Sequence, residues 1–235
     1  ESKPYRLFIA EPKANNKPLS VLYMLDGNAQ FPIAVNTVDP TQELPLIIGI
    51  GYVSENAYAI SERQRDYTFP VNGADFKNGG GASDFLRFIQ TQVKPEIEQQ
   101  YHINPEKQFF FGHSFGGLFG LYVLFQYYTL ASPSLWWGNG SFLPQTMPWI
   151  KSSPKHILIT LGEYEEYPER DPKLTSEQLQ RIEQRKKMRP FNAPKLAEKL
   201  VQQGYPVIFR WISHKNHGDS IEDAIKQMME DLQSK

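Results

Sequence analysis

A serine flanked by two glycines ends an apolar run of the sequence, in the segment Gly112-His113-Ser114-Phe115-Gly116. This is the G-x-S-x-G pattern, in which a strand turns sharply into a helix and the turn exposes a serine hydroxyl. The helix dipole favours negative charge that develops at this position. A side chain in place of either glycine is expected to collide with the neighbouring strand and helix. The bare pattern also arises by chance in roughly one chain in ten, so the assignment of Ser114 as a nucleophile depends on its partners.

A serine hydroxyl attacks efficiently only when a base takes its proton and a third group orients that base. In folds with this turn the nucleophile comes first in the chain, the acid second and the histidine last. The sequence has this order, with His217 near the C-terminus. The acids between the two form a cluster of Glu163, Glu165 and Glu166. All follow predicted strands, and open α/β sheets place their sites at the carboxyl ends of strands.

The base and the acid each have competing candidates. His214 and His217 share one loop, and we favour His217, which Gly218 follows. The His-x-x-His spacing could also hold a metal ion, but it lacks a third ligand and we expect none. His113, beside the nucleophile, is expected to point away from it. For the acid we favour Glu165 over Glu163; a solvated acidic surface and a Ser-His dyad with a weakly placed acid are the other interpretations.

The negative oxygen of a tetrahedral intermediate needs two backbone N–H donors. One is expected from Phe115, the residue after the nucleophile. The other is expected from the turn Asp26-Gly27-Asn28, which follows an apolar predicted strand at residues 21–25, and Asn28 is our candidate. The alternative interpretation of these residues is an ordinary tight turn.

The elements that must position these residues alternate between strand and helix, which indicates an α/β fold with a mostly parallel sheet. Strands are predicted at residues 5–10, 19–25, 46–52, 107–111, 127–131, 156–161 and 206–212. Helices are predicted at residues 31–38, 83–100, 114–125, 176–187, 193–203 and 221–232, with Pro95 as a possible kink. Residues 54–81 are predicted to form a loop. The strand at 46–52 is too apolar to be half exposed, so helices should cover both faces of the sheet.

The composition indicates one folded domain. A chain of 235 residues, 40% of them hydrophobic, can bury one sizeable core. A net charge of -1 gives no general attraction to nucleic acid or to an anionic membrane. No apolar run approaches the ~20 residues of a membrane span, and the absence of cysteine excludes disulfides, thiolate nucleophiles and cysteine-ligated metals. Because the chain begins with Glu1 instead of Met, we expect that an N-terminal segment has been removed.

Short motifs occur in order along nearly the whole chain. They are Tyr23-Met24-Leu25-Asp26-Gly27-Asn28, Gly49-Ile50-Gly51-Tyr52, residues 63–68, Gly79-Gly80-Gly81, Gly112-His113-Ser114-Phe115-Gly116-Gly117, Ser132-Pro133-Ser134-Leu135-Trp136-Trp137 and His217-Gly218. With these motifs the sequence resembles the esterase D-like family of α/β-hydrolases, and most closely the enterochelin/salmochelin-type siderophore esterases. Together the motifs are specific for the family and not for a substrate.

The resemblance implies roles for several residues: Ser114 as nucleophile, His217 as base, and Asn28 and Phe115 as oxyanion donors. In related esterases the acid comes three residues after a glycine that ends a strand. Gly162 places this position at Glu165, where several relatives have Asp, and some siderophore esterases of this group lack a well-formed acid. The resemblance therefore favours Glu165 and leaves the dyad open.

The same resemblance implies residues that bind the substrate. Arg63 and Arg65 are expected to face the acyl or catecholate part of an anionic substrate, and the alternative is a structural ion pair or an exposed charge. Trp137, with Trp136, is expected to form the floor of a pocket for an aromatic acyl group, although one of the two should belong to the core. A small cap at residues 163–192 could fold over the site, and a solvated helix face is the alternative.

The sequence therefore predicts a serine esterase that works through an acyl-enzyme, on a single α/β-hydrolase domain at residues 1–235. No metal or organic cofactor is expected. The expected substrate is a catecholate siderophore trilactone, iron-free or ferric, in the periplasm or the cytoplasm, with the periplasm slightly favoured. One alternative is a carboxylesterase or thioesterase of the S-formylglutathione hydrolase kind, against which the absence of cysteine counts. The other is a non-catalytic binding module with the same fold.

Overall fold

The computed structural model describes residues 5–13, 17–123, 125–140, 153–187 and 191–235. Its strands are β1 Tyr5–Ala10, β2 Leu19–Met24, β3 Leu46–Tyr52, β4 Ile103–His113, β5 Tyr127–Ala131, β6 His156–Gly162 and β7 Val207–Ile212. They form one seven-stranded sheet in the order β1-β3-β2-β4-β5-β6-β7. β1 is antiparallel to β3, and the other neighbouring pairs are parallel. The mostly parallel sheet predicted from the sequence is therefore confirmed.

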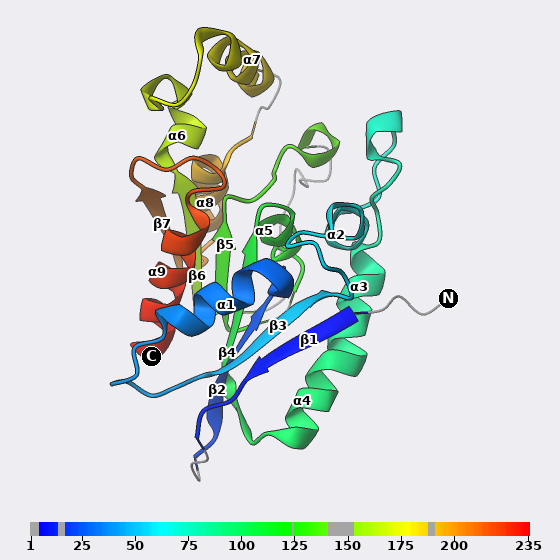
Figure 1. Cartoon of the computed structure of the whole chain (residues 1–235), viewed down its shortest axis with the longest axis vertical. Helices are drawn as coiled ribbons and strands as arrows, with labels where there is room; N and C mark the ends of the chain where they lie inside the picture. The colour runs from blue at the N-terminus through cyan, green and yellow to red at the C-terminus, as the bar shows by residue number, and fades with distance from the viewer. Residues whose placement is uncertain (1–4, 14–16, 124, 141–152, 188–190) are drawn as a thin grey trace.

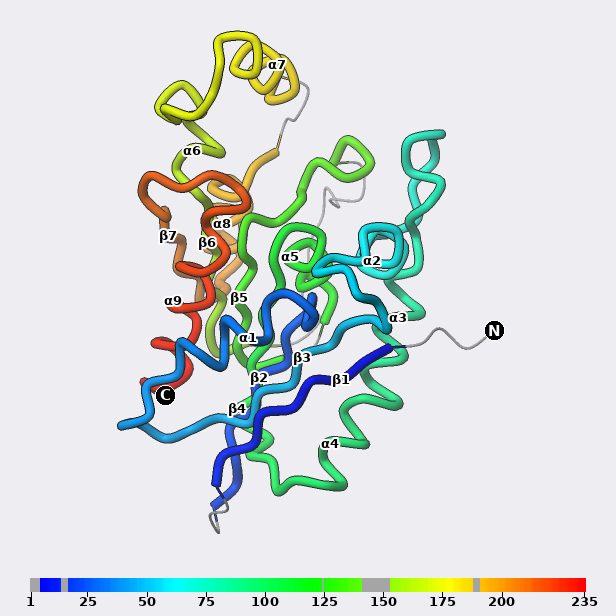
Figure 2. Tube along the Cα trace, in the orientation of Figure 1, coloured from blue at the N-terminus to red at the C-terminus, as the bar shows by residue number. Residues whose placement is uncertain are grey.

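Helices cover both faces of this sheet, as Figures 1 and 2 show. One face packs against α1 (Gly27–Thr37) and α9 (Ile221–Gln233). The helices on the other face are α2 (Ile60–Tyr67), α3 (Ala82–Phe88), α4 (Lys94–Gln100), α5 (Phe115–Phe119) and α8 (Ala193–Gln202). The predicted arrangement of helices on both faces is thereby confirmed.

The central strands are apolar throughout because successive side chains enter two different cores. In β2, Val21 and Tyr23 belong to the core beneath α2, α3, α4, α5 and α8, whereas Leu22 and Met24 belong to the core beneath α1 and α9. All four side chains are fully buried. A continuous apolar run in the sequence therefore corresponds to a strand that is covered on both sides.

Two further helices lie beyond the carboxyl end of β6, at the top of Figure 1. They are α6 (Glu163–Glu166) and α7 (Ser176–Lys187), and α7 has the bounds predicted from the sequence. Both belong to the predicted cap at residues 163–192, of which residues 188–190 lie outside the described part of the chain. Within the described ranges, no helix is long and apolar enough to cross a membrane.

Three predictions about helices were wrong in their bounds or their type. The helix predicted at 31–38 begins at Gly27, because Asp26 has a left-handed φ of 54° and its turn leads directly into the helix. The loop predicted at 54–81 contains α2, which buries only Asp66 and Tyr67 and so lacks apolar periodicity. The helix predicted at 114–125 ends at Phe119, because β5 must begin opposite Phe109 of β4 and the chain needs the following residues to reach it. Residue 124 of that prediction lies outside the described part.

The helix predicted at 83–100 is interrupted by a turn of π-helix, η2 (Ile89–Val93), between α3 and α4. Pro95 lies two residues after the end of this turn, and it has no N–H to donate to the carbonyl of Thr91 one helical turn earlier. The irregularity expected at Pro95 is therefore present as a π-helical turn just before it.

The turn from β4 into α5 depends on close backbone approaches. A Cβ atom on Gly112 would collide with the carbonyl group of Gly116, so the prediction that this position needs glycine is confirmed. The prediction for Gly116 was wrong, because a Cβ atom there would lie 3.5 Å from Leu25, an ordinary contact. Gly117 is the tighter position, since its Cβ would lie 3.0 Å from the carbonyl oxygen of Ala131.

We predict that Gly112→Ala lowers the free energy of unfolding by about 1–3 kcal/mol, because the added methyl group must displace the first turn of α5. Gly218→Ala is the control, since its Cβ would meet no atom closer than 4.0 Å. We expect the control to stay within about 0.5 kcal/mol of the wild type. Urea unfolding followed by circular dichroism measures both, and equal stability of the two variants would contradict the steric role of Gly112.

Candidate active site

Ser114 occupies a strained turn between β4 and α5. Its φ of 61° and ψ of -118° lie outside the regions that side chains ordinarily allow. Its N–H donates to the carbonyl of Ala131 at 3.0 Å, and its own carbonyl accepts from Leu118 at 3.0 Å. These bonds to β5 and α5 hold the backbone in the strained conformation, and the residue is half-buried.

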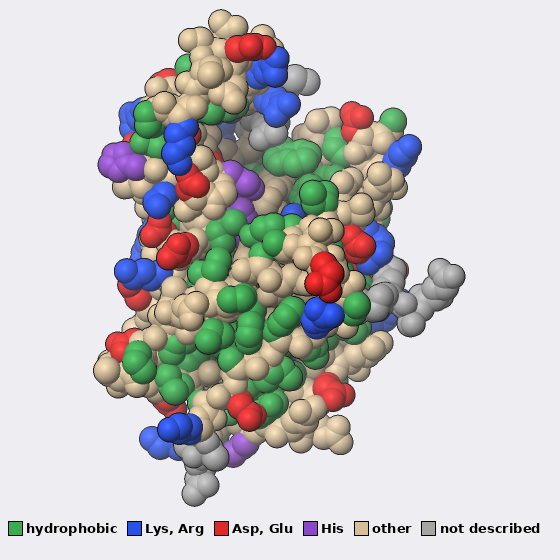
Figure 3. All heavy atoms as spheres, in the orientation of Figure 1, with side chains coloured by type: hydrophobic (Ala, Val, Ile, Leu, Met, Phe, Trp, Pro, Cys, Tyr) green, Lys and Arg blue, Asp and Glu red, His purple; other side chains and the backbone are tan. Residues whose placement is uncertain are grey.

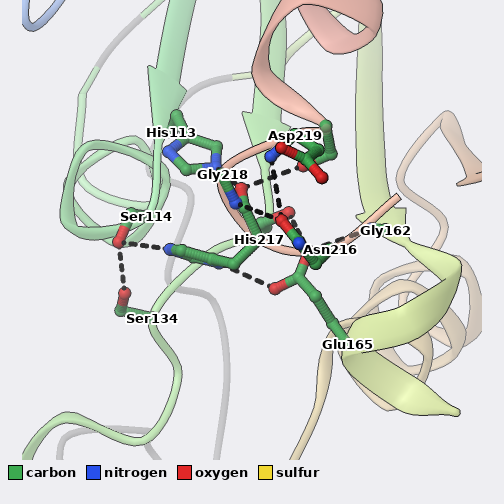
Figure 4. A network of polar contacts seen from close by, with 11 residues as sticks. His113, Ser114, Ser134, Gly162, Glu165, Asn216, His217, Gly218 and Asp219 are labelled. Atoms are coloured by element: carbon green, nitrogen blue, oxygen red, sulfur yellow. Dashed lines mark hydrogen bonds and ion pairs between the residues drawn. The ribbon is translucent and has the colours of Figure 1, made fainter. Parts of the chain in front are cut away.

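The structure brings together the three side chains that the sequence predicted as a triad, and Figure 4 shows how they face one another. His217 Nε2 lies 3.0 Å from Ser114 Oγ, and His217 Nδ1 lies 2.7 Å from Glu165 Oε2. An ionised carboxylate only accepts hydrogen bonds, so Nδ1 carries the proton in this arrangement. In the neutral imidazole Nε2 then accepts from the Ser114 hydroxyl. The arrangement can remove the serine proton and store it on a ring that a carboxylate orients.

Glu165 is held by donors on two neighbouring strand ends. The Ser132 hydroxyl donates to Oε1 at 2.6 Å, and the Gly162 N–H donates to the same atom at 3.0 Å. The second carboxylate oxygen remains for His217. Ser132 was not predicted as a site residue. The only signal for it was its place in the motif that follows β5.

Glu163, the competing acid, is engaged elsewhere. It accepts from the Arg170 side chain at 2.9 Å and from the His214 N–H at 2.9 Å. The hydrogen bond from the His214 N–H has the largest effect in lowering the pKa of the Glu163 carboxyl, and the hydrogen bond from Arg170 lowers it further. The His214 ring lies beside Tyr164, with centroids 6.1 Å apart. Among the described residues, no three His, Cys, Asp or Glu side chains are grouped so that they could hold a metal ion.

His113 points away from the serine hydroxyl and contacts the loop that carries His217. Its Nε2 lies 2.9 Å from the His217 carbonyl oxygen, which also accepts from Ser220 Oγ at 3.1 Å. Because a carbonyl only accepts, Nε2 of His113 must carry a proton. Burial, together with His217, lowers the pKa of His113 well below its ordinary value, so the ring is neutral at pH 7. His113 therefore fixes the backbone of the His217 loop through an uncharged donor.

The two predicted oxyanion donors lie in the first turns of α1 and α5. Pairing of Met24 with Phe111 places the turn at residues 26–28 beside the Ser114 turn. Neither Asn28 N–H nor Phe115 N–H has an acceptor within the described part of the protein. The Asn28 side chain is tied to the backbone of Tyr52, which it accepts from at 2.8 Å and donates to at 2.9 Å.

The predicted substrate-binding arginines form the ion pairs that were the alternative interpretation. Arg63 binds both oxygens of Asp26, at 2.6 and 3.0 Å, and its side chain is only 11% exposed. Burial lowers the pKa of Arg63, but the Asp26 carboxylate outweighs this effect and raises it above the ordinary value. Arg65 binds both oxygens of Asp66 at 2.7 and 2.8 Å. Arg63 thus holds the left-handed Asp26 that begins the predicted oxyanion turn.

A cavity of about 140 Å³ adjoins His217 and Glu165 on the side of α7 and α8. Trp136 forms the wall of the cavity on the side of β5, and Lys186 and Phe191 form the opposite wall. The prediction for Trp137 needs correction, because only 1% of this residue is exposed and its Nε1–H donates to the Phe69 carbonyl at 2.9 Å. Figure 3 shows this face of the molecule hollowed between the parts that carry α7 and α2, with histidine side chains at the base of the hollow.

The sequence matches the Esterase family model over residues 3–187. It is 34% identical over 197 residues to the ferri-bacillibactin esterase BesA of Bacillus subtilis, which covers 71% of this chain and 68% of that protein. It is 31% identical over 228 residues to the siderophore enterobactin esterase of Emericella nidulans, which covers 80% of this chain and 75% of that protein.

The fold is similar to that of solved structures. The siderophore hydrolase EstA from Aspergillus nidulans superposes with a TM-score of 0.83 at 26% identity, over 98% of this chain and 90% of that one. The BES protein from Bacillus cereus superposes with a TM-score of 0.76 at 26% identity, over 97% of this chain and 90% of that one. The chain therefore belongs to the Esterase family, has the α/β-hydrolase fold, and is an ester hydrolase.

Proposed function

We propose that this chain is a serine esterase that hydrolyses the ester bonds of catecholate siderophores, with Ser114 as nucleophile, His217 as base and Glu165 as acid. The observation that carries this proposal is the unbroken hydrogen-bond chain from Glu165 through His217 to the Ser114 hydroxyl. The engagement of Glu163 with Arg170 and His214 supports the choice of Glu165.

The reaction begins when Ser114 Oγ attacks the ester carbonyl carbon and its proton passes to His217 Nε2. The carbonyl oxygen becomes negative and accepts hydrogen bonds from the N–H groups of Asn28 and Phe115. Glu165 stays ionised and stabilises the imidazolium. The alcohol then leaves with the proton from Nε2, and water hydrolyses the acyl-enzyme by the same steps in the same site.

The substrate class is supported by the relatives and by the cavity beside His217. The two relatives are named as esterases of ferri-bacillibactin and of the siderophore enterobactin. The cavity has the aromatic residues Trp136 and Phe191 in its wall, which suits an aromatic acyl group. Lys186 also lines it, and its ammonium group binds Glu166. We propose that the segment at residues 163–192 acts as a cap by forming this outer wall.

We predict that the protein hydrolyses iron-free and ferric catecholate trilactones with a higher kcat/KM than short p-nitrophenyl esters. Ser114→Ala should lower the turnover of both classes by at least about 1,000-fold, because no other group can form the acyl-enzyme. Chromatography of the released catechol acids measures the reaction. Cleavage of the short esters alone would contradict the siderophore assignment, and turnover of neither class would contradict the serine esterase.

We predict that Glu165→Gln lowers kcat by about 100- to 10,000-fold, because an amide no longer stabilises the protonated His217 ring. Glu163→Gln is the matched control, two residues earlier in α6, and should keep kcat within a few-fold of the wild type. Steady-state kinetics on one ester substrate compares the two variants. A kcat that is unchanged in both would show that the enzyme works as a Ser-His dyad.

A further inference from the structure

A second serine hydroxyl touches the atom that we propose as the nucleophile. Ser134 Oγ lies 3.0 Å from Ser114 Oγ, and Figure 4 shows the two serine side chains together, with His217 between Ser114 and Glu165. Ser134 is 3% exposed and follows β5 by three residues. The only hydrogen-bond partner of its hydroxyl within the described ranges is Ser114.

The direction of this hydrogen bond follows from the positions of the protons. The proton on His217 Nδ1 faces Glu165, so Nε2 carries no proton and accepts a hydrogen bond. The single hydroxyl proton of Ser114 is donated to Nε2 in this bond. Ser114 Oγ can then only accept from Ser134. The Ser134 hydroxyl is therefore a donor that is aimed at a lone pair of the attacking oxygen.

The backbone around Ser134 does not need this hydroxyl to stay in place. The Ser134 N–H donates to the Ser114 carbonyl at 3.0 Å, and its own carbonyl accepts from Trp137 N–H at 3.3 Å. Pro133 packs against α5, where a Cβ atom on Gly117 would lie 3.1 Å from the Pro133 Cα atom. The main-chain contacts thus fix the position of Ser134 without any contribution from its hydroxyl group.

We propose that Ser134 is a catalytic residue of this esterase, which stabilises negative charge on Ser114 Oγ while that atom attacks the ester carbonyl and again while it departs. The inference rests on the proposed function of Ser114. A donor aimed at an atom that gains charge in the transition state lowers the barrier, as oxyanion donors do. Ser134 thus donates a hydrogen bond to the nucleophilic oxygen, whereas the N–H groups of Asn28 and Phe115 donate to the carbonyl oxygen.

The step balances without a further reactant. In acylation the O–H bond of Ser114 breaks, its proton goes to His217 Nε2, and the Oγ lone pair forms the bond to carbon. In deacylation water attacks the acyl carbon and gives up its proton to Nε2. The C–Oγ bond then breaks, its electron pair returns to Oγ, and Oγ takes the proton back from Nε2. Ser134 keeps its own proton throughout and only donates the hydrogen bond.

The test compares Ser134→Ala with the wild type in two assays. The first is the second-order rate constant of Ser114 modification by a fluorophosphonate, which reports attack alone. The second is steady-state and burst kinetics on p-nitrophenyl acetate. We expect the modification rate and kcat to fall by about 10- to 100-fold, with KM within about twofold because Ser134 acts on the attacking oxygen and not on the bound substrate. Ser20→Ala, a buried serine in β2 that is remote from the site, should match the wild type.

The outcomes separate this inference from the function on which it rests. A wild type that reacts with neither reagent contradicts the serine esterase itself. A reactive wild type and an equally fast Ser134→Ala variant overturn only the role of Ser134. If Ser134→Ala unfolds at a clearly lower temperature than the wild type, Ser134→Thr decides, because it keeps the hydroxyl. Recovery of most of the modification rate in the Thr variant supports the proposal, and a rate as low as that of Ala overturns it.

Discussion

The parallel pairing of the central strands is the constraint on which the site depends. Strands that run in the same direction end at the same edge of a sheet, so the residues that follow them meet in space although they are far apart in the sequence. The proposed oxyanion turn follows β2, Ser114 follows β4, Ser132 and Ser134 follow β5, Glu165 follows β6 and His217 follows β7. Each inter-strand hydrogen bond that keeps the register therefore also keeps the distances between the groups that we propose to react. A change of register at β4 or β5 would move Ser114 relative to every one of its partners.

Charges beneath the site are paired, and this pairing gives the proposed oxyanion turn its rigidity. Asp26 and Asp66 are buried, and each binds an arginine through both carboxylate oxygens. An unpaired carboxylate at either position would carry a large desolvation cost. The Asp26 main chain, in a left-handed conformation, leads directly into the first turn of α1 and to Asn28. The ion pair between Asp26 and Arg63 of α2 thus restrains the turn that carries the Asn28 N–H, which we propose as an oxyanion donor.

Much of this arrangement could be predicted from the sequence, because the order of the residues along the chain, the ends of the strands and the motifs are all visible in the sequence itself. The proposed triad of Ser114, Glu165 and His217 was predicted in this way, and so were most strands. The roles of Arg63 and Trp137 could not be predicted, since they depend on which carboxylate or carbonyl lies across the fold from each side chain. The contacts of Ser132 and Ser134 depend likewise on the neighbouring strand and on side-chain rotamers. The end of α5 at Phe119 was missed because the pairing of β5 with β4, and not local helix propensity, decides where the helix stops.

We propose that ester hydrolysis proceeds through a covalent bond to Ser114. The most direct measurement is mass spectrometry of the protein after rapid acid quenching of a reaction with a catecholate trilactone, followed by peptide mapping. We expect a transient mass increase of one acyl group on the peptide that contains Ser114, and a longer-lived adduct when Glu165 is replaced by Gln. Full turnover without any adduct on this peptide, or an adduct on another side chain, would contradict it.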